Sequence, residues 1–268
     1  MCGIAGYSLS DESRIDQTLA TQTLLAAISE RGSDAVGYAY RGLDATLTIH
    51  KQRGGASALL ERLRVPGKAR AALVHVRDYT KGHPSLIANN HPIRHGTVVG
   101  IHNGIIVNDE QIFTRHGFER AEPGMTVDSE AIFALAEKAS SSSEALEELH
   151  GSMAAAWADE REPELVHLAR GIGRPLWIGQ GARELFFAST RRALELVEAY
   201  AGVRLAKREV GEGTLVSAGE GAVVRTDSFE PDRTFVEPSP LPPVRAPEEA
   251  RSALARLAAI VTASASAR

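Results

Sequence analysis

The sequence has very little cysteine: Cys2 is the only one among 268 residues. An intramolecular disulfide and a thiolate cluster for structural zinc are therefore excluded. Long apolar runs are missing too, and the first residues lack the basic region and apolar core of a signal peptide. We therefore expect a cytoplasmic protein with no membrane partner.

A surplus of basic charge is also missing, because 30 Lys and Arg stand against 34 Asp and Glu, for a net charge of -4. Proteins that bind nucleic acid depend on cationic side chains to neutralise phosphates, so nucleic acid is not an expected partner. The hydrophobic content of 43% and the charged content of 24% are those of a folded globular protein. The length suits one large domain or two small ones.

Strands and helices are predicted in blocks rather than in strict alternation. Helices are expected from residue 15, from a capping box at Asn108 and Gln111, and from Asp128, a candidate N-cap. Strands are expected at 3–9, 36–41, 45–51, 71–77 and 97–101, with an antiparallel meander between 154 and 189. This order favours an α+β fold with helices layered on antiparallel sheets.

The chain is expected to divide at residue 230. Residues 2–230 carry the strand and helix patterns and form the predicted folded domain. Residues 231–268 differ, because the segment 237–247 contains five prolines, which is typical of an extended linker, and an Ala-rich helix is predicted beyond it.

Cys2 is the residue with the clearest potential for chemistry. Removal of the initiator methionine, expected before so small a side chain, leaves a thiol and a free α-amine on one residue. Their ordinary pKa values lie close together, so the amine can accept the thiol proton near neutral pH. The alternative is that a lone cysteine is a small buried hydrophobic residue.

Polar residues follow two of the predicted strands. Asn103 and Gly104 offer an amide and a main-chain N–H that can converge on one oxygen as an oxyanion hole, although Asn-Gly is also typical of a hairpin turn. Arg77 opens a long Gly- and His-rich segment, a candidate lid, and its guanidinium fits a carboxylate, although an arginine at a strand end is often only solvated. Asp128 can cap a helix or face a substrate ammonium.

Histidine is concentrated in one region, because five of the nine histidines lie between His75 and His102. That density raises the hypothesis of a metal site. The spacing does not match a helical HExxH motif or a zinc finger, so we expect no metal and no cofactor.

Five segments, taken in order, resemble the glutaminase domain of the class II glutamine amidotransferases, which are N-terminal-nucleophile (Ntn) hydrolases. They are MCGIAGY, RGSDAVG, HVRDYT, HNGIIVN and DSEAI. The resemblance spans about residues 2–230 and looks closest to the glutaminase domain of glucosamine-6-phosphate synthase. It implies a four-layer αββα sandwich of two antiparallel β-sheets flanked by helices.

The resemblance also implies catalytic roles. Cys2 matches the family nucleophile, which forms a γ-glutamyl thioester with glutamine while ammonia leaves. Asn103 and Gly104 match the oxyanion hole. The implied reaction is the hydrolysis of L-glutamine to glutamate and ammonia.

The resemblance implies substrate-binding roles as well. Arg77 matches the group that binds the α-carboxylate of glutamine, and Asp128 matches the group that binds its α-ammonium. Thr80 matches a threonine of the loop that closes over glutamine. Arg31 and Gly32 match a loop that lines the nucleophile.

Asp78 and Lys81 depart from this pattern, because glucosamine-6-phosphate synthase has Trp and His at these places. Nothing after residue 230 resembles an acceptor domain, so we expect the ammonia to pass to a separate synthase subunit. Assembly into a homo-oligomer stays open. Two other functions also stay open: an Ntn amidase for another amide, and a catalytically idle regulatory protein that binds glutamine.

Overall fold

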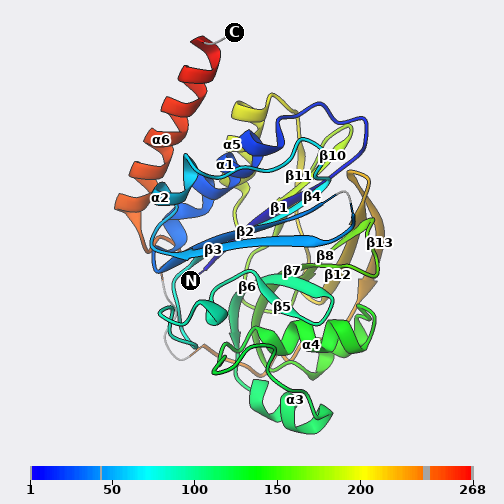
Figure 1. Cartoon of the computed structure of the whole chain (residues 1–268). Coiled ribbons are helices and arrows are strands. Elements are labelled where there is room, and N and C mark those ends of the chain that lie inside the picture. Colours follow the sequence, from blue (N-terminus) through cyan, green and yellow to red (C-terminus); the bar gives the residue numbers. More distant parts are fainter. Residues whose placement is uncertain (1, 43, 238–241, 267–268) are drawn as a thin grey trace.

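Two antiparallel β-sheets lie face to face, and helices cover the outer face of each sheet (Figure 1). The computed structural model describes residues 2–42, 44–237 and 242–266. The predicted αββα sandwich is confirmed. In the described part of the chain, no helix combines the length and the apolar character needed to cross a membrane.

The larger sheet has seven strands in the order β11-β9-β10-β1-β4-β2-β3. In its interior, β1 and β4 are buried at every residue, because the other sheet covers one face and helices cover the other. The bounds in sheet order are Ala206–Glu209, Trp177–Gln180, Glu184–Ala188, Gly3–Leu9, Ala71–Arg77, Ala35–Arg41 and Leu47–Arg53.

The smaller sheet has six strands in the order β13-β12-β8-β7-β6-β5. Apolar side chains of the two sheets, among them Ile4, Leu73 and Ile101, fill the space between them. The bounds in sheet order are Ala222–Ser228, Thr214–Gly219, Leu165–Arg170, Gly151–Asp159, Val98–Ile106 and Ile93–His95.

In the described part of the chain, four helices lie on the outer side of the larger sheet and two cover the smaller one. Those on the side of the larger sheet are α1 (Gln17–Ile28), α2 (Ser57–Leu60), α5 (Arg191–Ala201) and α6 (Pro247–Ser266). On the smaller sheet lie α3 (Asp109–His116) and α4 (Glu130–Lys138). Three short 3₁₀ turns complete the described elements: η1 (Ser29–Arg31), η2 (Ile87–Asn89) and η3 (Glu144–Glu148).

The C-terminal helix α6 packs on the helical layer of the larger sheet, beside α1 and α2 (Figure 1). Ala253 and Leu257 are fully buried there. Arg256 pairs with Glu61 at 2.8 Å. The predicted helix is thus present and joins the core of the fold. Part of the predicted Pro-rich linker, 238–241, lies outside the described residues, and the boundary at residue 230 stays a prediction.

Two local predictions are wrong. The meander between 154 and 189 is divided, since β7 and β8 belong to the smaller sheet whereas β9 and β10 belong to the larger one. The side-chain caps are the second: α3 begins after Asn108, as predicted, and α4 begins soon after Asp128, but neither side chain bonds to the N–H groups of its helix. The alternative of a hairpin turn at Asn103 and Gly104 does not hold, because both residues lie inside β6.

Candidate active site

The pairing of β1 with β4 positions Cys2. Gly3 lies opposite Val76 in this register, so Cys2 and Arg77 emerge side by side at the end of the two strands. The Cys2 thiol donates a hydrogen bond to the carbonyl of Asp78 at 3.5 Å. The Arg31 Nε donates to the Cys2 carbonyl at 3.2 Å. Both the main chain and the thiol of Cys2 are therefore held.

Five of the eight residues that the sequence singles out for the site line one cavity, which further includes Tyr79, Lys81, His91, His102, Val127 and Ser129. The five are Cys2, Arg77, Thr80, Gly104 and Asp128. The cavity volume is about 10 Å³, roughly the space that one water molecule needs. A larger ligand can enter only when the surrounding loop moves.

The Cys2 thiol is protonated in this closed state. Burial raises its pKa, and the positive charge of Arg77 opposes that shift. The described hydrogen bond of the thiol goes to a main-chain carbonyl and not to a histidine. Burial also lowers the pKa of His75 and of His102 to about 3, which makes both imidazoles poor bases at neutral pH. A base for Cys2 must therefore come from elsewhere.

Asp128 places a buried carboxylate in the cavity. One of its oxygens accepts a hydrogen bond from the Ile106 N–H at 2.7 Å. Burial raises its pKa to about 6, so the group is mainly ionised at neutral pH. A buried carboxylate in a small cavity is suited to a cationic ligand group.

Arg77 holds the loop that covers the cavity. Its guanidinium is almost fully buried and donates to the carbonyls of Lys81, Gly82 and Asn89 and to the side-chain oxygen of Asn90. These partners come from the two sides of the lid-like segment. A carboxylate bound at Arg77 would have to replace some of these acceptors.

Asn103 is fully buried, and neither polar atom of its side chain has a partner in the described part of the chain. Gly104, next to it on β6, has a φ of +147°, and a Cβ there would lie 1.9 Å from the Ser152 carbonyl. Only glycine fits that position. An unpaired buried amide beside an obligatory glycine is a feature that folding alone does not explain.

Arg31, Gly32 and Thr80 differ in their contacts. Arg31 is buried and touches the site through the Cys2 carbonyl. Gly32 packs on main chain, since a Cβ there would lie 2.4 Å from the Arg77 carbonyl. Thr80 is exposed on the loop and lines the cavity.

Asp78 and Lys81 each have an ion-pair partner that sequence reasoning missed. Arg245, just before α6, donates to the Asp78 carboxylate at 2.9 Å. Lys81 contacts both oxygens of the buried Asp109 carboxylate at 2.7 Å. These partners lie far away in the sequence, so no local pattern indicates them. The loop next to Cys2 is therefore tied to α3 and to the C-terminal segment.

The clustered histidines are also placed by the structure. His75 and His91 stack with their ring centres 4.2 Å apart, and His102 shares a hydrogen bond with Ser129 at 2.8 Å. Among the described residues, no three His, Cys, Asp or Glu side chains are grouped so that they could hold a metal ion.

A family model described as a glutamine amidotransferase domain matches residues 75–196. Glutamine–fructose-6-phosphate aminotransferase (isomerizing) of Vibrio cholerae is 32% identical over 203 residues, which are 72% of this chain and 32% of that protein. The protein of the same name from Listeria innocua is 28% identical over 259 residues, 90% of this chain and 41% of that protein. The chain is thus similar to the class II glutamine amidotransferases, and its homologues of that class are enzymes.

Solved structures agree with this family in their fold. Glutamine phosphoribosylpyrophosphate amidotransferase of B. subtilis, in complex with ADP and GMP, superposes with a TM-score of 0.65 at 19% identity over 85% of this chain and 49% of that one. A structure described as the allosteric regulatory enzyme of purine biosynthesis gives 0.67 at 22% identity over the same shares. The chain spans about a third of the length of the first curated relatives and about half of these structures.

The ion pair between Arg245 and Asp78 predicts that its loss changes the exposure of the Cys2 thiol. Replacing Arg245 with Gln (Arg245→Gln) removes one ion pair of Asp78, whose carbonyl accepts the hydrogen bond of the Cys2 thiol. Partly exposed ion pairs contribute about 0.2–1 kcal/mol, so alkylation of Cys2 by iodoacetamide should become about two- to fivefold faster. Mass spectrometry of the intact protein measures that rate.

Arg256→Gln is the matched control, because it breaks another ion pair between the α6 region and the domain, away from Cys2. Its alkylation rate should equal that of the unmodified chain. Equal acceleration in both variants would mean that α6 loosens as a whole, and the specific role of Arg245 would be wrong.

Proposed function

We propose that this protein hydrolyses L-glutamine to glutamate and ammonia, with Cys2 as the nucleophile. The observation that carries the proposal is the single cavity shared by a thiol, a buried carboxylate and a buried guanidinium. Free glutamine carries an ammonium and a carboxylate at one end and an amide at the other. Asp128 and Arg77 complement the two charges, and Cys2 faces the amide.

Removal of Met1 is the first requirement, since it frees the α-amine of Cys2. The amine then accepts the thiol proton, and the thiolate attacks the γ-amide carbon of glutamine. Histidine is unsuitable as the base, because the nearby imidazoles have strongly lowered pKa values. The α-amine supplies a base with an ordinary pKa near 8.

The tetrahedral intermediate carries its negative charge on the former amide oxygen. The Asn103 amide and the Gly104 N–H are the proposed donors to that oxygen. The carbon–nitrogen bond then breaks, the protonated amine gives its proton to the leaving nitrogen, and ammonia departs. Water attacks the remaining γ-glutamyl thioester, glutamate leaves, and the thiol is restored.

Substrate admission requires the loop around Thr80 to open, because the closed cavity is far smaller than glutamine. During closure, the substrate carboxylate takes the place of loop carbonyls at Arg77. Ammonia then passes to an acceptor domain or subunit, as the family implies, and we propose a separate synthase subunit. The two curated relatives named above are glutamine–fructose-6-phosphate aminotransferases, but the identity of the acceptor here stays a proposal.

Cys2→Ala should abolish the release of glutamate and ammonia from L-glutamine. The assay needs chain whose N-terminal residue, read by mass spectrometry, is Cys2, because a retained Met1 blocks the amine. Release that persists in Cys2→Ala would contradict the mechanism. Glutamine binding without release by chain with a free Cys2 would favour the idle binding protein, and faster turnover of another γ-amide would favour a different amidase.

Asn103→Ala should lower kcat by about 100- to 1000-fold with a small change in KM, as expected for the loss of one oxyanion donor. Its melting temperature should stay close to that of the unmodified chain, because the Asn103 amide has no partner to lose. Steady-state kinetics and thermal unfolding measure the two effects.

Asn108→Ala is the control of the same residue type. The Asn108 side chain donates to the Glu148 carbonyl and accepts from the His150 N–H, at 2.8 and 2.9 Å. Its loss should lower the melting temperature and leave kcat nearly unchanged. A lower melting temperature in Asn103→Ala together with a lower kcat in Asn108→Ala would contradict the assignment of Asn103 to the oxyanion hole.

The pH dependence of glutamine binding should report Asp128. Its pKa is raised to about 6, so the carboxylate is charged above that pH and neutral below it. The attraction for the substrate ammonium is thus lost as the pH falls, and KM should rise by up to about tenfold per unit below pH 6. Kinetics between pH 5 and 8 test this expectation.

Asp128→Asn provides the comparison for the pH series. The variant should have a high KM at every pH and lack the rise below pH 6. An unchanged rise in Asp128→Asn would assign the titration to another group.

A further inference from the structure

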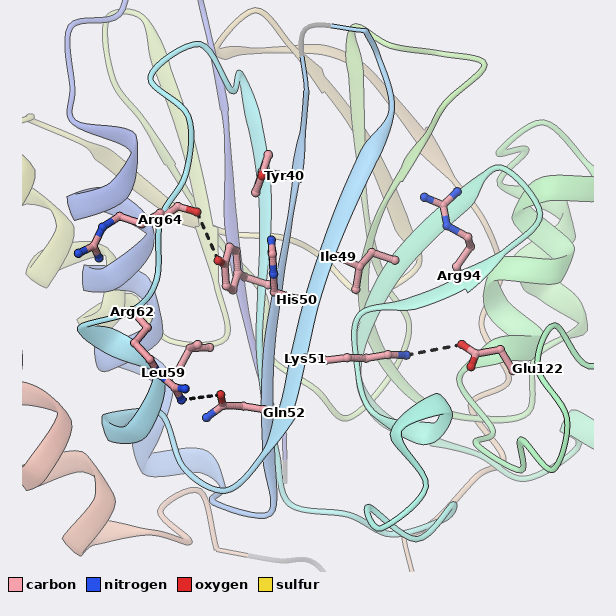
Figure 2. Close-up of a pocket in the computed structure, with 11 residues that line it drawn as sticks. Tyr40, Ile49, His50, Lys51, Gln52, Leu59, Arg62, Arg64, Arg94 and Glu122 are labelled. Carbon is pink, nitrogen blue, oxygen red and sulfur yellow. Dashed lines mark hydrogen bonds and ion pairs between the residues drawn. The ribbon is translucent and has the colours of Figure 1, made fainter.

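A cavity of about 790 Å³ runs along the edge strand β3, apart from the cavity at Cys2. β3 is the last strand of the larger sheet, and β5 is the last strand of the smaller one. Figure 2 shows side chains on both sides of β3 facing this space, with Lys51 reaching toward Glu122 and with Tyr40 and His50 on the opposite side of the strand. We call this space the β3 groove.

The main chain of β3 has a free side along the groove. The Leu47 N–H donates to the Glu160 carboxylate at 2.9 Å, and its carbonyl accepts from Arg94 at 2.9 Å, so both groups of Leu47 point away from β2. Main-chain groups alternate in direction along an antiparallel strand, and those of Ile49 and Lys51 therefore point the same way. Side chains protect the edge at Leu47, but the described residues offer no hydrogen-bond partner to the outward groups of Ile49 and Lys51.

Positive charge dominates the lining of the groove. Its charged residues are four cations and a single carboxylate: Lys51, Arg62, Arg64, Arg94 and Glu122. Arg94 pairs with Glu160 at 3.0 Å, so the excess of positive charge comes from the other three cations. Arg62 bonds to a Gln52 side chain and a carbonyl, and Arg64 bonds only to carbonyls, so no carboxylate neutralises either of them. Lys51 lies 3.9 Å from Glu122, a long distance for an ion pair. The groove therefore favours an anionic occupant.

Aromatic rings form a flat wall on one side of the strand. Tyr38 and His50 lie on paired strands and stack with their ring centres 4.8 Å apart, and Tyr40 continues the stack. Cross-strand neighbours of this kind stabilise an added strand through contacts with its side chains.

We propose that the β3 groove binds an extended acidic segment of a partner polypeptide, which adds to the larger sheet as an eighth strand beside β3. Main-chain hydrogen bonds to Ile49 and Lys51 provide the pairing, as in other cases of strand addition. Carboxylates on one face of the segment meet Arg62 and Arg64, which lie on the same side of β3 as Tyr40 and His50 (Figure 2). A second copy of β3 is a poor match, because β3 (LTIHKQR) carries Lys51 and Arg53 and has no carboxylate to meet the cations of the groove.

Only the short turn η2 separates the groove at Lys51 from the candidate active site at Arg77. Lys51 donates to the Ala88 carbonyl in η2 at 3.5 Å, and Arg77 donates to the Asn89 carbonyl of the same turn. The proposal does not rest on glutamine hydrolysis, and its test measures binding alone.

The test uses the full chain and a fluorescein-labelled synthetic hexapeptide of alternating glutamate and valine, titrated by fluorescence anisotropy at low salt. The double variant Arg62→Glu/Arg64→Glu should bind the peptide at least about tenfold more weakly. The matched double variant Arg192→Glu/Arg204→Glu reverses two exposed arginines outside the groove and should bind it normally. Hydrogen exchange should slow at Ile49 and Lys51 when the peptide is present.

Two further peptides separate pairing from charge. A peptide with lysine in place of glutamate should not bind, and one that is N-methylated at every amide should lose most of its affinity, since it has no N–H left to donate to the edge of β3. Ile49→Pro removes an outward N–H and should have the same effect as N-methylation. If that variant does not fold, the arginine variants and the methylated peptide still decide.

Three results would overturn the proposal. The first is the absence of binding by the acidic peptide at millimolar concentration. The second is equal affinity in the two double variants. The third is full affinity of the methylated peptide, which would mean binding by charge without strand pairing.

Discussion

The antiparallel register between β1 and β4 is the constraint on which the candidate site depends. Both strands are central and buried on both faces, so their apolar side chains leave little freedom to slip. A shift by one residue would turn every side chain of a strand to the opposite face. Because Gly3 pairs with Val76, the residue before β1 and the last residue of β4 meet at one sheet end. The cysteine and the guanidinium are neighbours for that reason.

Two ion pairs hold the loop after β4 in addition to the hydrogen bonds of Arg77. Asp78 and Lys81 replace Trp and His of the family pattern, and each forms an ion pair with a distant element. The carboxylate of Asp78 therefore contacts Arg245 and does not compete with a substrate carboxylate for the Arg77 guanidinium. Both ion pairs tie the loop to elements outside it.

Sequence patterns predicted what depends on neighbours along the chain. The strands at Gly3–Leu9 and Ala71–Arg77 have the predicted bounds, since continuous apolar runs between turns are a strong local signal. Asp128 was ambiguous, because a carboxylate before a helix fits a cap as well as a binding group, and only the contact with Ile106 separates the two. The division of β7 to β10 between two sheets and the Arg245 contact depend on the folded arrangement, which a local pattern does not contain.

The unpaired amide of Asn103 has a consequence for stability. A buried polar group without a partner costs about 1–3 kcal/mol, and an apolar side chain of similar size would avoid that cost. Under the proposed function, the folded protein bears this cost. In return, the Asn103 amide is already desolvated and oriented when negative charge forms on the substrate oxygen. The solvent and the protein then have little left to rearrange during the reaction, and part of the activation barrier is met in advance, when the chain folds.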